Sequence, residues 1–318
     1  MSRIKNMVTL ARAYLDHRHR LGSRLECDGR RVLEFAAYAD NSRHKGPITT
    51  ELALRWACLP RHGSDLNRAR RLQMVRCFAR YAAMFDEATE VPARGLLGQS
   101  NRRIQPHIYS DVEIGQLMNA AGELSPVNGL RPRTYVALFG LLASTGIRIS
   151  EALNLRRCDV DLKQRVLRIV ESKFRKSRLV VIHPTTCIQL QAYERFRDQY
   201  PYPPRNPEAF FLSERGKPLS RSMAEPTFRS ILRRLGWDTG VGRRRPRLYD
   251  FRHAFACHRL LQWYRDGVDV QHAIASLSTY LGHSTLRDTY WYLTGIPELM
   301  CIATSRFERF AKDHQRES

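Results

Sequence analysis

The chain has 318 residues, of which 43% are hydrophobic, and 53 Lys and Arg against 31 Asp and Glu give it a net charge of +22 at pH 7. Domains usually contain about 100–200 residues, so we expect two domains, and the hydrophobic share excludes a wholly disordered chain. No run of about 18 apolar residues is present, which excludes a membrane-spanning helix of ordinary length. Residues 1–30 lack an apolar signal core, so we expect a cytoplasmic protein.

The positive charge indicates a polyanionic partner. Residues 1–104 contain 20 Lys and Arg against 10 Asp and Glu, so both parts of the chain are basic. Nucleic acid is the leading candidate, in association with the nucleoid. A membrane surface is a weaker candidate because no amphipathic Lys-rich helix stands out, and a merely solvated surface remains an alternative. The seven cysteines have no metal-binding spacing, and we expect them to be buried reduced thiols.

The N-terminal part of the chain predicts a helical domain over residues 1–90. Apolar residues recur at helical spacing in four segments, and no strand pattern appears. The third segment begins at Thr50, which we expect to cap its helix, and ends at Pro60. The four segments are residues 7–15, 32–39, 50–60 and 72–85.

Residues 91–107 predict a linker, because Pro, Gly and Asn interrupt the helical pattern there. Arg102 and Arg103 make this linker basic, which suits a chain that crosses a phosphate backbone. Ser110 and Glu113 have the spacing of a capping box and begin the second domain, which we place over residues 108–318.

The second domain has a mixed pattern. Residues 135–143 predict a helix that stops near Gly146, and a short helix follows from Ser150. Two runs rich in β-branched residues predict a hairpin with a basic turn, and Pro184 predicts the start of another helix. The strands expected here are residues 166–170, 179–182 and 209–212. From Ser220 onward the pattern is helical, so the predicted fold class is mostly α with a small antiparallel β-sheet (α+β).

Residues 297–314 predict a C-terminal helix with an apolar side. Whether this helix packs on its own domain or on a neighbouring protomer is left open by the sequence.

Three short stretches of the second domain combine basic and nucleophilic side chains. The first is Thr-Gly-Ile-Arg-Ile-Ser-Glu at residues 145–151, and the second is Tyr-Asp-Phe-Arg-His at residues 249–253. The third is Leu-Gly-His at residues 281–283, with Tyr292 nine residues after His283. Each stretch alone has an ordinary structural explanation, because an Arg after a turn is usually solvated and a Tyr near a helix end usually packs.

Together and in this order, the stretches resemble the three motifs of the tyrosine recombinase (phage integrase) family, over about residues 108–295. The N-terminal domain resembles the family's core-binding domain in its helical type only. The resemblance implies that the mixed domain is the catalytic domain. It also implies a homotetramer on double-stranded DNA, or a mixed assembly with sibling recombinases.

The resemblance assigns the site residues one at a time. Arg148 and Arg252 match the two catalytic arginines, and Glu151 matches the acidic residue that supports the first of them. His283 matches the His-or-Trp position, and Tyr292 matches the nucleophile. Lys173 matches the lysine of the hairpin turn, with Lys176 as the rival choice.

The chemistry of phosphodiester cleavage suits these residue types. Two guanidiniums can each fork onto the non-bridging oxygens and neutralise the charge that grows in the transition state, so no metal or other cofactor is expected. A phenol with a pKa of about 10 is a poor nucleophile, and we expect the neighbouring Arg charge to lower its pKa. Lys173 is the natural acid for the departing 5′ oxygen. The product is a 3′-phosphotyrosyl link that can be rejoined without ATP.

One residue departs from the family pattern. Tyr249 stands where the family usually has His, and a phenol can donate a hydrogen bond but is a poor base near neutral pH. Our main prediction is a site-specific recombinase of a mobile element, active in integration, excision or transposition. Tyr249 leaves open a non-catalytic DNA-binding sibling that supports another recombinase. A relaxing topoisomerase of type IB kind is a third alternative, because it shares the same chemistry.

Other basic side chains are candidates for phosphate contacts rather than chemistry. The predicted DNA-binding residues are Arg102, Arg103, Arg175, Lys176, Arg243, Arg244 and Arg245. His253 and Cys257 are one helical turn apart, which makes a metal site conceivable. No second pair of ligands is placed near them, so we interpret them as core residues.

Overall fold

The computed structural model describes residues 6–23, 25–59, 63–100, 106–170, 177–201, 204–237 and 245–293. The chain divides into two compact units, Met1–Ile104 and Gln105–Ser318. Each unit has its own hydrophobic core, and each is described here by itself.

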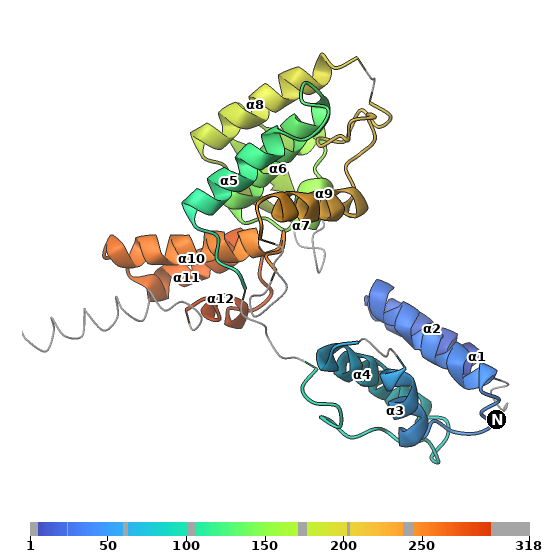
Figure 1. Cartoon of the computed structure of the whole chain (residues 1–318). Helices are drawn as coiled ribbons and strands as arrows, with labels where there is room; N and C mark the ends of the chain where they lie inside the picture. Colours follow the sequence, from blue (N-terminus) through green and yellow to red (C-terminus); the bar gives the residue numbers. More distant parts are fainter. Residues whose placement is uncertain are drawn as a thin grey trace, which may run out of the picture. The chain divides into compact units, whose positions relative to one another are not determined.

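The first unit is a bundle of helices (Figure 1). Its helices are α1 (Met7–Arg20), α2 (Glu26–Asn41), α3 (Thr50–Cys58) and α4 (Asp65–Ala82). Phe35, Trp56 and Phe78 meet edge to face in its core. All four expected helices are present, but the cap of α3 is Thr49 and not Thr50. The hydroxyl of Thr49 accepts from the amide of Leu52, three residues later, which is the geometry of an N-cap.

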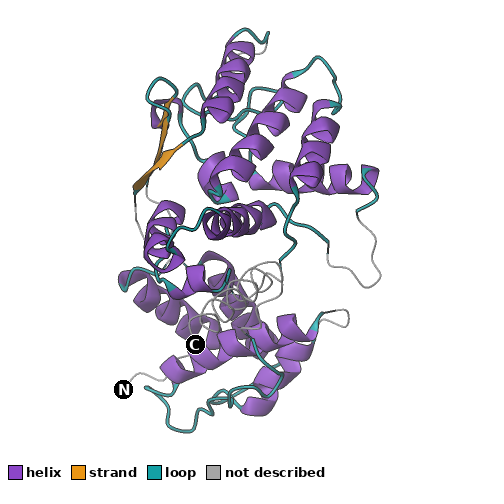
Figure 2. Ribbon diagram, turned by 90° about the vertical axis from the view of Figure 1, so that its left-hand side faces the viewer, coloured by secondary structure: helices purple, strands orange, loops and turns teal. Residues whose placement is uncertain are grey.

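The second unit combines helices with one small sheet (Figure 2). Its helices are α5 (Asp111–Gly122), α6 (Leu130–Thr145), α7 (Ile149–Leu153), the 3₁₀ helix η1 (Arg157–Asp159), α8 (Pro184–Asp198), α9 (Arg221–Arg234), α10 (Asp250–Arg265), α11 (Val270–Leu281) and α12 (Arg287–Tyr290). Its strands are β1 (Val160–Asp161), β2 (Val166–Ile169) and β3 (Arg178–Val181). The fold class predicted from the sequence is confirmed.

The sheet is antiparallel with the order β1–β2–β3. Val166 pairs with Val181 and Ile169 pairs with Arg178, so the predicted hairpin is present. The prediction of a third strand at 209–212 is wrong. Ala209 and Leu212 of that segment form only isolated bridges, with Arg156 and Pro218, so no ladder continues there, and Phe210 and Phe211 are fully buried in the core. The strand that completes the sheet is β1.

Helix α6 lies at the centre of the second unit and is in contact with α5, α8 and α10. Because its neighbours surround it, α6 is buried on nearly all sides and ends in the turn that carries Arg148. The predicted capping box at the start of α5 is present: the Ser110 hydroxyl accepts from the Glu113 amide, and Glu113 accepts from the Ser110 amide.

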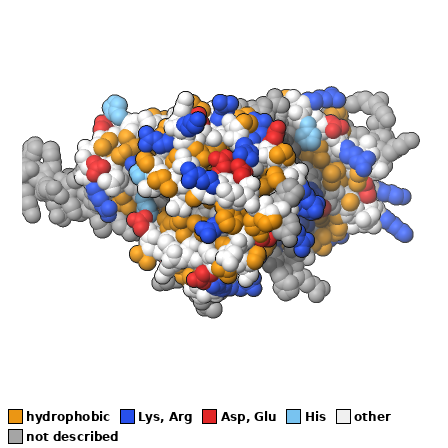
Figure 3. Space-filling model, turned by 90° about the horizontal axis from the view of Figure 1, so that it is seen from above, with side chains coloured by type: hydrophobic (Ala, Val, Ile, Leu, Met, Phe, Trp, Pro, Cys, Tyr) orange, Lys and Arg blue, Asp and Glu red, His pale blue; other side chains and the backbone are white. Residues whose placement is uncertain are grey.

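Other general expectations can be compared with the described part of the chain. Within it, no helix is long and apolar enough to cross a lipid bilayer. Cys187 and Cys257 are buried and outside any disulfide, but Cys58 and Cys158 are exposed, so the expectation of buried thiols is wrong for these two. On the face shown in Figure 3, Lys and Arg side chains are scattered among hydrophobic and acidic ones.

Candidate active site

The first motif forms a turn between α6 and α7 that only glycine fits well. Gly146 ends α6 with φ +61, and a Cβ atom there would lie 2.6 Å from the Phe255 ring. Arg148 follows as the N-cap residue of α7. The Glu151 carboxylate accepts from the Arg148 backbone amide at 2.9 Å and from its Nη1 at 2.7 Å. The motif therefore holds Arg148 by both its backbone and its side chain.

The second motif places Arg252 in the first turn of α10, where its side chain is 1% exposed. Arg252 Nη1 donates to the Gly146 carbonyl at 3.0 Å, and Nη2 donates to the Leu281 carbonyl at 2.7 Å. Its Nε has no hydrogen-bond partner among the described residues. Burial lowers the pKa of Arg252, and the nearby phenol of Tyr292 opposes that change. A guanidinium still stays protonated in proteins, so this is a buried cation held by carbonyls.

The third motif lies at the C-terminal end of α11, where Gly282 caps the helix with φ +69. Three consecutive carbonyls at this end accept from three different arginines. The Tyr280 carbonyl accepts from Arg178 Nε at 2.8 Å, the Leu281 carbonyl from Arg252, and the Gly282 carbonyl from Arg148 Nη2 at 2.8 Å. The end of a helix carries partial negative charge, so guanidiniums are stabilised there. This row of carbonyls brings the first and second motifs together.

Arg178 is a site residue that our sequence analysis missed. Its Nη1 and Nη2 donate to the two oxygens of Glu151 at 3.0 and 2.9 Å, so one carboxylate binds two guanidiniums. The alternation of β3 could have revealed it. Val180 is buried, Arg178 is on the same face two residues earlier, and a cation on a buried face needs a partner.

Glu151 is ionised at neutral pH despite its burial. Burial alone raises the pKa of this carboxyl, but the hydrogen bonds and charges of Arg178 and Arg148 outweigh burial and hold the pKa at about 2. Because Glu151 is shared by two arginines, its charge cancels only one of the two. With Arg252 beside them, the group keeps a net positive charge.

Tyr292 is 3% exposed and packs between two imidazoles. Its ring lies 5.4 Å from that of His253, at a steep angle, and 5.9 Å from that of His283, nearly parallel. We expected the neighbouring Arg charge to lower the pKa of Tyr292, and the net result is the opposite. Burial raises the pKa to about 12, and the Arg252 charge offsets only part of that increase.

His283 follows Gly282 and is partly buried. Its Nδ1 lies 2.7 Å from the hydroxyl of Thr289, which orients the ring. Burial and the charges of Arg252 and Arg148 lower the pKa of His283 to about 4. The imidazole is therefore neutral at pH 7 and can donate or accept one hydrogen bond through Nε2.

Tyr249 lies at the start of α10 and is 41% exposed. Its ring meets that of His253 edge to face at 5.0 Å. His253 in turn contacts the Tyr292 ring, with the ring centroids 5.4 Å apart. A chain of rings thus runs from the exposed Tyr249 to the buried Tyr292.

The structure brings together six of the seven residues predicted to be catalytic. The seventh, Lys173, lies outside the described residues. So do most of the predicted DNA-binding residues: Arg102, Arg103, Arg175, Lys176, Arg243 and Arg244. Arg245 is described and exposed. Within the described residues no cluster of His, Cys, Asp or Glu could hold a metal ion, and His253 and Cys257 are buried in the core.

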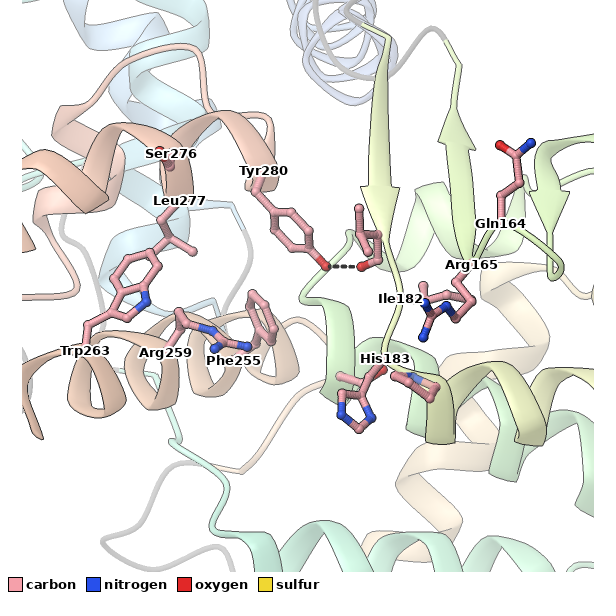
Figure 4. Close-up of a pocket in the computed structure, with 13 residues that line it drawn as sticks. Gln164, Arg165, Ile182, His183, Phe255, Arg259, Trp263, Ser276, Leu277 and Tyr280 are labelled. Atoms are coloured by element: carbon pink, nitrogen blue, oxygen red, sulfur yellow. Dashed lines mark hydrogen bonds between the residues drawn. The ribbon is translucent and has the colours of Figure 1, made fainter. Parts of the chain in front are cut away.

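A pocket of about 580 Å³ lies between the end of β3, α10 and α11 (Figure 4). Phe255, Trp263 and Leu277 give it an apolar wall. None of the predicted catalytic residues lines it, so this pocket is not the candidate active site.

Comparison with known proteins gives the family. Residues 110–295 match the phage integrase family. The chain is 41% identical over 306 residues to the integrase/recombinase y4rB of Sinorhizobium fredii, covering 94% of this chain and 96% of that protein. The chain belongs to the phage integrase family. This recombinase is also 30% identical over 225 residues to tyrosine recombinase XerC of Chlamydia caviae, covering 70% of this chain and 65% of that protein.

The fold of the recombinase also matches solved structures. The Tn1549 transposon integrase, in complex with circular intermediate DNA, superposes with a TM-score of 0.69 at 15% identity, covering 96% of this chain and 99% of that one. At this identity the likeness concerns the fold. Family membership gives the activity: the chain is a tyrosine recombinase, an enzyme of site-specific DNA strand cleavage and rejoining.

Proposed function

We propose that Tyr292 is the nucleophile of this recombinase and that Arg148 and Arg252 bind the scissile phosphate. The observation that carries the proposal is the convergence of both arginines on the Leu281 and Gly282 carbonyls, directly before His283, which packs against Tyr292. A phosphate beside this row can accept hydrogen bonds from both arginines. These bonds would replace the bonds to the carbonyls, because charge-assisted bonds to phosphate are stronger than bonds to a neutral carbonyl.

The proposed reaction has two balanced steps. The Tyr292 oxygen attacks phosphorus and releases its proton to solvent, and the bond from phosphorus to the 5′ oxygen breaks. Lys173, our assignment for the acid, gives that oxygen a proton, which yields a 3′-phosphotyrosyl link and a free 5′-hydroxyl. In the second step a 5′-hydroxyl gives its proton to Lys173, which is now neutral, and attacks the link, and the tyrosine leaves and takes up a proton from solvent. His283, neutral at pH 7, donates to the phosphate.

The test is covalent trapping on a nicked duplex from which the cleaved end diffuses away. We expect a protein–DNA adduct that Tyr292→Phe abolishes and that Tyr290→Phe retains. Tyr290 is a matched control because it lies two residues away and is 44% exposed. Fluorescence anisotropy should give the same DNA affinity for both variants. An adduct that persists in Tyr292→Phe would disprove the assignment.

One observation favours a second function. Tyr249 stands where the family usually has His, and because a phenol is a poor base near neutral pH, this favours a DNA-binding sibling that supports another recombinase. The same trapping experiment decides between the two. A wild-type chain that binds DNA tightly and forms no adduct is the sibling, whereas relaxation of supercoils at no defined site indicates a topoisomerase.

We also propose that four protomers assemble on two DNA sites on the nucleoid, that residues 1–90 form the core-binding domain, and that residues 91–107 link it to the catalytic domain. In this proposal the arginines of residues 91–107 and of residues 243–245 contact phosphates. Each phosphate contact adds about 0.9 to the slope of log affinity against log salt. Replacing Arg243, Arg244 and Arg245 together by Gln should therefore lower that slope by about 3. Light scattering of the protein–DNA complex measures the number of protomers.

A further inference from the structure

Arg178 occupies an unusual place for a charged side chain. It is the first residue of β3 and pairs with Ile169 across the hairpin. Its side chain points to the buried face of the sheet, together with Val180, and is 10% exposed. None of the three motifs contains this residue, and the proposed reaction does not use it.

The partners of Arg178 are the parts of the site that hold Arg148. Two of its nitrogens bind the two Glu151 oxygens side by side, and the third binds the Tyr280 carbonyl. This is the paired geometry in which a guanidinium fixes the orientation of a carboxylate. Glu151 in turn binds the Arg148 backbone and side chain. The position of Arg148 therefore depends on a carboxylate that Arg178 orients.

Arg178 also connects the sheet to the end of α11. The Tyr280 hydroxyl donates to the Val181 carbonyl at 3.0 Å, the bond drawn in Figure 4, while the Tyr280 carbonyl accepts from Arg178. The guanidinium lies against Gly282 so closely that a Cβ there would be 2.8 Å from Arg178 Nη1. Strand β3 and the carbonyl row are thus fixed to each other at two points.

The contact between Arg178 and Glu151 also determines how much of the Arg148 charge is balanced. If Arg178 were neutral, Glu151 would bind Arg148 alone, and the pair would be close to neutral. Arg148 would then lose much of its attraction for a phosphate, because its charge would be balanced by a carboxylate 2.7 Å away. A second guanidinium on Glu151 keeps Arg148 available for an anion.

We propose that Arg178 is a positioning residue for strand cleavage: through Glu151 it orients Arg148 toward the scissile phosphate and keeps its charge available. The proposal rests on the proposed role of Arg148. Arg178 itself does not touch the reacting atoms, so its effect is on the rate of the chemical step and not on general DNA affinity.

The experiment compares Arg178→Gln with the wild type in single-turnover cleavage at saturating DNA. We expect the rate to fall by about tenfold or more, which is less than the loss of about 10²–10³ typical of removing a donor that contacts the transition state directly. DNA affinity should change by less than about threefold, since all three guanidinium nitrogens of Arg178 are bonded to Glu151 and the Tyr280 carbonyl and make no phosphate contact of their own. Arg168→Gln is the matched control, because Arg168 lies on β2 of the same hairpin and points outward; it should cleave at the wild-type rate.

Substrate chemistry separates positioning from a merely structural role. A methylphosphonate at the scissile position lacks the negative oxygen that Arg148 neutralises, so the deficit of Arg178→Gln should shrink on this substrate. A 5′-bridging phosphorothiolate has a leaving group that needs no acid. If only this second substrate restores the rate, Arg178 acts through the hairpin lysine, and our proposal is wrong. A deficit that neither substrate reduces is a general structural defect and also overturns it.

Arg178→Lys is the second variant, in case Arg178→Gln folds poorly. Lysine keeps the charge but cannot bind both Glu151 oxygens, so its rate should fall between those of wild type and Arg178→Gln. A wild-type chain without any adduct would mean that the proposed function fails. If the wild-type chain cleaves, and both Arg178→Gln and Arg178→Lys cleave as fast as the wild type, only the present inference fails.

Discussion

Replacing Glu151 by Gln tests how much the charge of this carboxylate stabilises the fold. The test measures the free energy of unfolding and needs no DNA. Glutamine keeps the shape of the side chain but removes the charge that two guanidiniums share. A pKa held at about 2, against 4.5 for the ordinary carboxyl, corresponds to about 3 kcal/mol of stabilisation at neutral pH. Breaking a buried ion pair by removing one partner typically costs about 3–5 kcal/mol, which agrees. We therefore expect Glu151→Gln to lose about 3 kcal/mol at pH 7.

The pH dependence of this loss has a definite sign. The pKa of Glu151 is depressed in the folded chain, so its stabilisation is present above pH 4.5 and is lost as the pH falls toward 2. The difference between wild type and Glu151→Gln should therefore shrink as the pH is lowered below 4.5, because the unfolded wild-type chain then takes up the proton. At pH 3 the difference in the free energy of unfolding between wild type and Glu151→Gln should be about 1 kcal/mol.

Native-state hydrogen exchange in low urea is the assay, because it reports the opening free energy of one unit at a time. The slowest amides of α6 and α10 report the unit that contains Glu151. Glu225→Gln is the control: Glu225 is paired with Arg221 on an exposed helix face, and its loss should cost less than about 1 kcal/mol. A loss below about 1 kcal/mol for Glu151→Gln at pH 7, or one that grows as the pH falls, would refute the reasoning.

Three further outcomes follow from the site. Tyr249→His should raise the single-turnover cleavage rate near neutral pH, because imidazole exchanges a proton there and phenol does not, and Tyr249→Phe should lower it without weakening DNA binding; equal rates for all three would reduce Tyr249 to packing. Gly282→Ala should destabilise the second unit by about 1–3 kcal/mol in the same exchange assay, because φ is +69 and the new methyl would lie 2.8 Å from Arg178; a neutral effect would contradict the close approach. The absorbance at 295 nm, measured as wild type minus Tyr292→Phe, should show no ionisation below about pH 10.5, because burial raises the pKa of Tyr292 to about 12; a midpoint below 10 would contradict its burial.

Local rules were enough to predict the elements whose signals are local. The capping box at Ser110, the glycine end of α6 and the β-branched hairpin were predicted correctly. Errors arose where two residues of the same kind compete or where an element is very short. Thr49 and Thr50 are chemically equivalent caps, and only the path of the chain selects Thr49. A two-residue strand such as β1 has no periodicity to detect.

The sequence predicted the residue types of the site but not the pKa of Tyr292 or the contacts of Arg178. Spacing and resemblance identified both arginines, but the pKa of Tyr292 depends on how burial compares with the Arg252 charge, which only coordinates give. Arg178 escaped because motif spacing ignores the face of a strand. Its importance follows from a contact with Glu151 across 27 positions in the chain.

The carbonyl row explains how this site can bury cations and still bind an anion. Arg252 is almost fully buried, yet its two Nη donors end on the Gly146 and Leu281 carbonyls and on no carboxylate. A carbonyl orders a guanidinium without neutralising it, whereas a second carboxylate would cancel the charge that a phosphate requires. When a phosphate oxygen replaces a carbonyl as the acceptor, the guanidinium exchanges a neutral hydrogen bond for a charge-assisted one. The side chain needs little reorganisation to do so. By this reasoning the Glu151 carboxylate can be tolerated beside a phosphate site because two arginines share it, so that Arg148, which is partly buried, keeps charge for an anion.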